Sequence, residues 1–253
     1  MLLDPKAKRP PLPHGGIVCG VLAAEHVGAV AAIAAIATSL IASARLRPGG
    51  WTKFAAATLA AILVAAELGW WIYLAATGAR GSDLSTALPL QLCDVAIFVG
   101  AAALLLRTQL LVEVTYFWGL AGTIQALITP DLPQHFPSFP FFQYYTAHGG
   151  IVTAALFLVV GLGQWPRRDA VLRVLALTVA YAAVVGAIDA ATGANYLYLR
   201  SKPASGSLLD LLGPWPWYIA SAAVIAIALL FVLDAPFRFL RGRMSNRGRD
   251  AES

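Results

Sequence analysis

Long runs of apolar residues, separated by short polar segments, dominate the pattern along the chain. No strand-like alternation or regular turn spacing interrupts them. A helix needs about 20 mostly apolar residues to cross a bilayer, and seven segments meet this requirement. These are residues 17–44, 54–76, 88–106, 110–129, 143–164, 170–191 and 216–234. The pattern predicts an all-α, polytopic membrane protein with about seven transmembrane helices.

The organisation that this pattern predicts is a single seven-helix domain over residues 1–240, followed by a basic cytoplasmic tail over residues 241–253. The first apolar segment is longer than the core of a signal peptide, which spans about 7–15 residues. We therefore expect it to remain in the mature protein as a membrane span.

Basic residues between the spans predict the orientation of the helices. Segments that face the cytoplasm carry an excess of Lys and Arg. With the N-terminus outside, the inner segments hold 12 of the 18 basic residues and the outer segments hold 6. The sequence therefore predicts an N-out, C-in topology, and the C-terminal tail supplies much of the bias.

Composition narrows the class of protein further. Apolar residues make up 59% of the chain and charged residues 12%, against about 25% charged residues in soluble domains. These values argue against a soluble globular enzyme and exclude a disordered chain, and two cysteines exclude a disulfide scaffold. The net charge of +5 reflects topology, because no basic patch interleaved with aromatic residues indicates nucleic-acid binding.

Ionisable side chains inside the predicted spans gather at one depth. Each costs about 2.5–3.5 kcal/mol in the middle of a bilayer, so such residues mark candidate functional sites. In the N-out topology six of them share the outer half of the bundle: Glu25, His26, Glu67, Asp94, His148 and Asp189. Glu113 lies near the inner end of its span and is expected to reach the lipid headgroups. The shared depth predicts one outward-facing polar cavity.

Two long connections are expected to cover that cavity. Residues 129–145 contain four prolines and no Lys or Arg, and because proline fixes φ and removes a donor, this segment should be a stiff, non-helical lid. Residues 191–217 have a similar character, with Trp215 and Trp217 as anchors in the membrane interface. Both connections are rich in aromatic residues, which suggests a site for a partly apolar molecule.

Several stretches together resemble the YwaF-like integral membrane proteins, a bacterial family. They are LPLQLCDVA (88–96), YFWGLAGTIQALITPDL (116–132), the pair His148-Gly149, NYLYLRSKP (195–203) and LLDLLGPWPWY (208–218). The resemblance covers roughly residues 85–220, with His26 and Glu67 continuing it upstream. It implies a multi-pass protein of the bacterial inner membrane.

The YwaF-like family is related to a vertebrate multispan acyltransferase that remodels ether phospholipids through a cysteine. This relation implies that Cys93 is the nucleophile and His148 the matching histidine. It further implies a membrane phospholipid or lysophospholipid as partner, although the particular lipid does not carry over to a bacterial membrane.

The residues themselves support a catalytic interpretation of Cys93, His148 and Asp189. Cys93 follows Gln91 at a predicted helix N-terminus, where backbone N–H groups favour a thiolate; an inert, packed cysteine is the alternative. His148 precedes two glycines, which fit close approach of a ligand or another backbone, and it is the candidate general base. Asp189 is the candidate that orients the histidine.

A second group of polar residues is interpreted as lining the substrate site. The amides of Gln91, Gln125 and Asn195 are candidate donors to a developing oxyanion, and Lys202 is a candidate partner of a phosphate headgroup. The full set is Gln91, Asp94, Gln125, Thr129, Asn195, Tyr196, His26, Glu67 and Lys202. Hydrogen bonding between helices is the alternative role for these residues.

Neither a metal nor a cofactor is predicted, because no spacing such as HExxH is present. A disulfide between Cys19 and Cys93 would remove the nucleophile, and the outer position of both residues leaves this alternative open.

Two further classes of function compete with a lipid acyltransferase or acyl hydrolase. One is a transporter that uses the polar layer as a binding site, and the other is a non-catalytic lipid- or solute-binding protein. The sequence contains no inverted repeat and no matching pair of spans broken by Gly or Pro, which weighs against transport.

Overall fold

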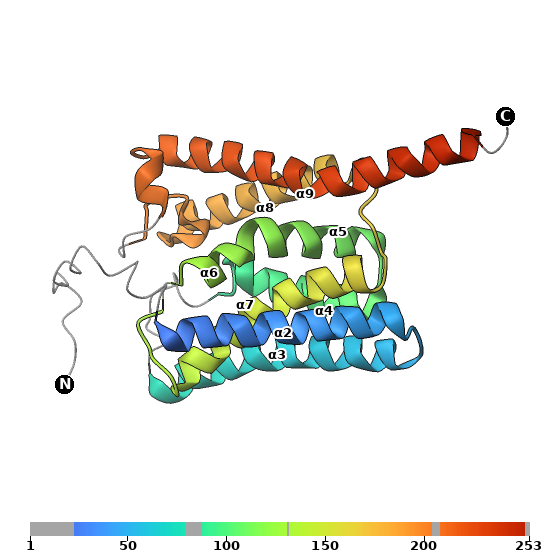
Figure 1. The fold of residues 1–253 in the computed structure, drawn as a ribbon. Helices are drawn as coiled ribbons and strands as arrows, with labels where there is room; N and C mark the ends of the chain where they lie inside the picture. Colours follow the sequence, from blue (N-terminus) through green and yellow to red (C-terminus); the bar gives the residue numbers. More distant parts are fainter. Residues whose placement is uncertain (1–22, 79–87, 131, 204–207, 251–253) are drawn as a thin grey trace.

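The computed structural model describes residues 23–78, 88–130, 132–203 and 208–250, with the side chains of 244–250 left out. Within these residues the chain is helical and has no strand. Six helical segments are long and apolar enough to cross a membrane, and a seventh apolar helix has 15 residues. The predicted all-α, polytopic architecture is therefore confirmed (Figure 1). The seven segments are α2 (Ala24–Leu46), α3 (Trp51–Thr77), α4 (Leu92–Leu106), Gln109–Ile128, Phe139–Gly161, α8 (Ala170–Thr192) and α9 (Trp217–Asp250).

Two of the spans contain a π-helical turn. The first runs through α5 (Gln109–Phe117), the π-helix η1 (Trp118–Thr123) and α6 (Ile124–Ile128). The second runs through α7 (Phe139–Leu156) into the π-helix η2 (Phe157–Gly161). Short 3-10 helices, η3 (Tyr196–Tyr198) and η4 (Leu208–Leu212), lie in the connection before α9.

Local sequence signals explain where the helices differ from the predicted spans. Helix α4 begins at Leu92 instead of residue 88, because Gln91 and Asp94 form a capping box that fixes the helix start. Helix α7 begins four residues earlier than predicted, with Pro140 in its first turn, where a missing N–H costs nothing. The non-helical lid is therefore shorter than residues 129–145. Helix α9 continues to Asp250, so most of the predicted tail is helical.

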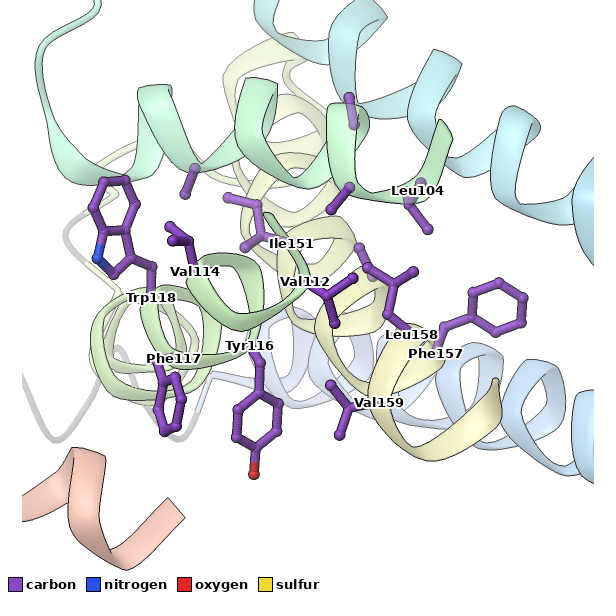
Figure 2. Packing of buried hydrophobic residues seen from close by; sticks show 14 of the residues in the cluster. Leu104, Val112, Val114, Tyr116, Phe117, Trp118, Ile151, Phe157, Leu158 and Val159 are labelled. Atoms are coloured by element: carbon purple, nitrogen blue, oxygen red, sulfur yellow. The ribbon is translucent and has the colours of Figure 1, made fainter. Parts of the chain in front are cut away.

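Helix α7 lies at the centre of the bundle. It contacts α2, α3, α4, α5, α6 and η1. In Figure 1, α8 and α9 lie on one side of this centre and α2 and α3 on the other. Figure 2 shows the apolar core where α4, α5 and α7 meet, in which Leu104, Val112 and Phe157 are buried. The core separates two polar ends, which we name after the predicted topology: the outer end, where α2 and α7 begin, and the inner end, where α3 and α8 begin.

Buried carboxylates at the inner end are paired with arginines. Glu113 is fully buried in α5 and accepts hydrogen bonds from the Nε (2.9 Å), Nη2 (3.0 Å) and backbone N–H (2.9 Å) of Arg167. Instead of reaching the headgroups, as expected, the buried Glu113 carboxylate forms an ion pair with the half-exposed Arg167, and its hydrogen bond raises the pKa of Arg167. Asp234, fully buried in α9, pairs with Arg238 and Arg241 in the same way.

Basic residues are concentrated at the inner end, where the loops before α3, α5 and α8 and the last part of α9 lie. By the positive-inside rule, we expect this end to face the cytoplasm. The orientation is tested with single cysteines at two exposed positions, in a chain whose own cysteines are alanine: Gln134→Cys on the outer connection and Arg168→Cys on the inner one. A membrane-impermeant maleimide added to intact cells should label only position 134. Labelling of position 168 alone would show that the protein has the opposite topology.

The Glu113–Arg167 pair should contribute measurably to stability. Removing one partner of a buried ion pair costs about 3–5 kcal/mol, and because Arg167 is half-exposed, we expect Glu113→Gln to cost about 2 kcal/mol. Asp169→Asn is the matched control, because the surface pair of Asp169 with Arg173 should be worth less than about 1 kcal/mol. Unfolding in mixed detergent micelles measures the stability of both variants. Equal losses of stability in Glu113→Gln and Asp169→Asn would contradict the expectation that the Glu113–Arg167 pair contributes more.

Candidate active site

Cys93, the predicted nucleophile, lies in the first turn of α4. Its thiol is free and half-buried, and the hydroxyl of Thr123 in the π-helix η1 lies beside it. Thr123 is fully buried and donates to the carbonyl of Trp118 (3.4 Å). Cys19, the other half of the disulfide alternative, lies outside the described residues. The nucleophile candidate therefore sits between a helix N-terminus and a π-helical turn.

Two carboxyl groups lie close to the thiol. Asp94 and the buried Glu67 both interact electrostatically with Cys93 and with each other. Glu67 accepts a hydrogen bond from Trp71 Nε1 (2.8 Å), and Asp94 accepts one from the backbone N–H of Gln91 (3.3 Å). The structure thus brings together Cys93, Asp94 and Glu67, which the sequence assigned to one polar layer.

His148 is held by its own helix. Its Nδ1 lies 2.8 Å from the carbonyl oxygen of Tyr144, and the two rings are tilted against each other with centroids 4.2 Å apart. A carbonyl oxygen only accepts hydrogen bonds, so Nδ1 carries a proton. In the neutral ring, the lone pair is therefore on Nε2. The imidazole is fixed in the tautomer that a general base requires.

The glycines after His148 serve helix packing. A Cβ atom at Gly149 would lie 2.6 Å from Ile33 Cδ1 of α2, and one at Gly150 would lie 2.8 Å from Leu63 Cδ2 of α3. The room beside these glycines is filled by side chains of neighbouring helices, instead of the ligand or backbone that the sequence suggested. His148 itself stays half-buried.

Asp189 anchors the connection between α8 and α9. It is fully buried, and its Oδ1 accepts a hydrogen bond from the backbone N–H of Tyr196 (2.9 Å). Its Oδ2 is buried and has no hydrogen-bond partner within the described residues. None of the described contacts joins Asp189 to His148, and the orienting contact expected from Asp189 is made by the carbonyl of Tyr144.

Asn195 and Gln91 also hold the connection that Asp189 anchors. The amide of Asn195 donates to the carbonyl of Ser201 (2.9 Å), while its oxygen accepts from the backbone N–H groups of Arg200 and Ser201. Gln91 Oε1 accepts from the backbone N–H of Leu197 (3.0 Å). Asn195 therefore closes the 193–201 loop on itself, and Gln91 fastens this loop to the start of α4.

Tyr196 strengthens this attachment of the loop. It is buried, and its hydroxyl accepts a hydrogen bond from the backbone N–H of Leu88 (3.1 Å). The loop is thereby tied to the residues that precede α4 at two points, one through Gln91 and one through Tyr196.

The remaining predicted site residues have separate surroundings. His26 Nδ1 lies 2.7 Å from the hydroxyl of Tyr145, and Lys202 pairs with Asp210 (3.6 Å). Thr129 donates to the carbonyl of Gln125 (3.1 Å), while the side chain of Gln125 is exposed. Among the contacts that the structure describes, none joins these residues to Cys93 or His148.

Three residues beside the candidate site do not belong to the set of site residues predicted from the sequence: Thr123, Tyr144 and Tyr181. The hydroxyl of Tyr144 donates to the carbonyl of Ala126 in α6 (2.9 Å), and that of Tyr181 donates to the carbonyl of Leu90 (2.8 Å), close to Asp94. Tyr144 had a detectable signal, because it lies one helical turn before His148. Thr123 had no detectable signal in the sequence, because a π-helical turn breaks the usual helical spacing of residues that share a face.

No described group of three or more His, Cys, Asp or Glu residues has the arrangement of a metal site.

The fold and the outer-end site define a multi-pass helical membrane protein with a half-buried thiol beside carboxyl groups. The model of the TMEM164 family matches residues 21–234, and the chain belongs to this family of transmembrane proteins. No curated protein and no solved structure matches the chain.

The anchoring role of Asp189 predicts a loss of stability when its carboxylate is removed. In Asp189→Ala, the buried N–H of Tyr196 loses its acceptor, which should cost about 1–3 kcal/mol. Asp210→Ala is the control, because Asp210 is half-exposed and makes a surface pair, and it should change stability by less than about 1 kcal/mol. Thermal unfolding in detergent compares the two. Full stability of Asp189→Ala would show that the loop does not depend on this contact.

Proposed function

We propose that this protein is a membrane lipid acyltransferase, or an acyl hydrolase when water is the acceptor, with Cys93 as nucleophile and His148 as general base. The observation that carries the proposal is the hydrogen bond between His148 Nδ1 and the carbonyl of Tyr144. It leaves Nε2 as the proton acceptor in a half-buried imidazole, on the outer half of the bundle that also holds the half-buried thiol.

The start of α4 supplies donors for an oxyanion. The first N–H groups of a helix have no intrahelical acceptor. The N–H of Asp94 is bound by the side chain of Gln91, and the N–H of Val95 by the carbonyl of Gln91. The N–H groups of Leu92 and Cys93 are therefore the candidate donors, and they replace the amides of Gln91, Gln125 and Asn195 in this role.

The proposed reaction has two steps. His148 Nε2 takes the thiol proton, and the Cys93 sulfur forms a bond to the carbonyl carbon of a lipid ester. The ester C–O bond then breaks, and the imidazolium gives its proton to the departing lysolipid oxygen. In the second step, His148 takes a proton from the hydroxyl of a lysophospholipid, or from water, and that oxygen attacks the thioester. The C–S bond breaks, and the thiol regains a proton.

The two ends of the bundle favour a site over a transport pathway. Between the outer-end residues and the inner end lies an apolar core with Leu104, Val112, Ile151 and Leu158 almost completely buried (Figure 2). At the inner end, Glu113 is closed off by its pair with Arg167. Within the described residues, the buried polar side chains of α5 and α7 in this core are the uncharged Thr115 and Thr153.

Substitution of the two catalytic candidates tests the proposal. Cys93→Ala and Cys93→Ser should both abolish acyl transfer, since a hydroxyl has a far higher pKa than a thiol. His148→Ala should lower the rate at least about 100-fold. The double variant should lose little more than either single variant, because the residues act as a unit. Transfer of labelled acyl chains between phospholipids in reconstituted vesicles measures the rates.

Cys19→Ala is the matched control and should keep the parent rate, which separates the loss of Cys93 from the loss of any cysteine. Unchanged unfolding temperatures would show that the inactive variants are folded. Full activity of Cys93→Ala would contradict the thiol mechanism and favour a non-catalytic binding protein or a transporter.

A further inference from the structure

The π-helix η1 is wedged between the helix of the thiol and the helix of the imidazole. A Cβ atom at Gly122 would lie 2.7 Å from Leu92 Cδ2, next to Cys93 on α4. A Cβ atom at Gly119 would lie 3.2 Å from Ala155 Cβ and 3.3 Å from Ile151 Cγ2 on α7. Both glycines therefore bring η1 closer to its neighbours than another residue would allow.

Polar contacts connect the same segment to both catalytic candidates. On one side, the hydroxyl of Thr123 in η1 lies beside the thiol of Cys93. Three residues further on, the carbonyl of Ala126 accepts a hydrogen bond from the hydroxyl of Tyr144 (2.9 Å). Tyr144 in turn packs on the ring of His148 and holds its Nδ1.

We propose that η1 and α6 form a spacer that sets the position of His148 relative to Cys93, and that Tyr144 is the positioning residue through which the spacer acts. The proposal rests on the acyl-transfer function proposed above. Its physical basis is that Tyr144 makes three contacts at once: a ring contact and a carbonyl contact with His148, and a hydroxyl contact with α6. π-Helical turns within α-helices are frequent at functional sites.

The variant Tyr144→Phe tests this role because it removes the hydroxyl contact with Ala126 and keeps the ring and the carbonyl. The whole chain, with Cys19 replaced by alanine, is reconstituted into vesicles, and two quantities are measured. The first is acyl transfer, for which kcat should fall about tenfold with KM unchanged, since misplaced catalytic groups slow chemistry more than binding. The second is the rate at which iodoacetamide alkylates Cys93 across pH 6–9.

Alkylation needs the thiol and its base but no lipid. It therefore tests the spacer role of η1 and α6 separately from the proposed acyl-transfer function. We expect His148→Gln to slow alkylation near neutral pH, because less thiolate forms without the base, and Tyr144→Phe to shift the pH profile toward that of His148→Gln. This pattern would support the spacer even if no lipid is turned over. An alkylation profile of Tyr144→Phe identical to that of the parent would overturn it.

Tyr116→Phe is the matched control. Tyr116 also donates its hydroxyl to a helix carbonyl, that of Leu233 (3.2 Å), but in the part of the core next to α9. It should leave both the alkylation profile and kcat at parent values. Equal effects of Tyr116→Phe and Tyr144→Phe would overturn the proposal, because they would show a general loss of packing.

A second pair of variants keeps the test open if Tyr144→Phe does not fold. Gly119→Ala should push η1 away from α7 and slow the alkylation of Cys93, and adding Ala155→Gly should restore part of the rate by removing the contacting methyl group. Gly28→Ala is the control, because no atom lies within 4 Å of a Cβ at that position. Parent-like alkylation in Gly119→Ala would overturn the proposal.

Discussion

The outer-end site depends on how closely the helices pack around α7. Lipid tails are as apolar as the side chains they touch, so helices in a bilayer associate through close van der Waals contact and hydrogen bonds. Gly149 and Gly150 let α2 and α3 approach α7, and Gly119 lets η1 approach it from another side. With these contacts in place, groups on different helices, such as the hydroxyl of Tyr144 and the backbone carbonyl of Ala126, come into hydrogen-bonding range.

The two ends of the bundle satisfy their buried charges by different means. At the inner end, Glu113 is paired with Arg167 and Arg173 from the segments that follow its span, and Asp234 is paired with Arg238 and Arg241 of its own helix α9. At the outer end, no described salt bridge includes Glu67, Asp94 or Asp189, and these groups depend on hydrogen bonds from indole and backbone N–H groups. The inner end therefore holds helices together, while the outer end keeps acidic groups beside a thiol.

Apolar length and shared depth could be predicted from the sequence, and geometry within the polar layer could not. Seven apolar segments of sufficient length predicted the helical bundle, because the bilayer leaves few alternatives. Cys93 and Glu67, which their depth in the spans assigned to one polar layer, interact electrostatically in the structure. The partner of a polar group is decided by three-dimensional contact, however: His148 is bound by the carbonyl of Tyr144, and Asp189 by a loop that returns to it after seven residues. The ion pair of Glu113 could not be predicted, because it depends on where Arg167 lies in space, and no spacing in the sequence reveals that position.

The π-helical turns also change the register of the spans that contain them. A π turn holds one residue more than an α turn, so every residue beyond it is rotated by about 100° relative to an uninterrupted α-helix. In η1 the side-chain hydroxyl of Thr123 donates to the carbonyl of Trp118, five residues back. The half of the span before η1 and the half after it consequently present their side chains in different directions. One continuous span can thus pack Val112 and Phe117 into the apolar core and still direct Thr123 toward Cys93.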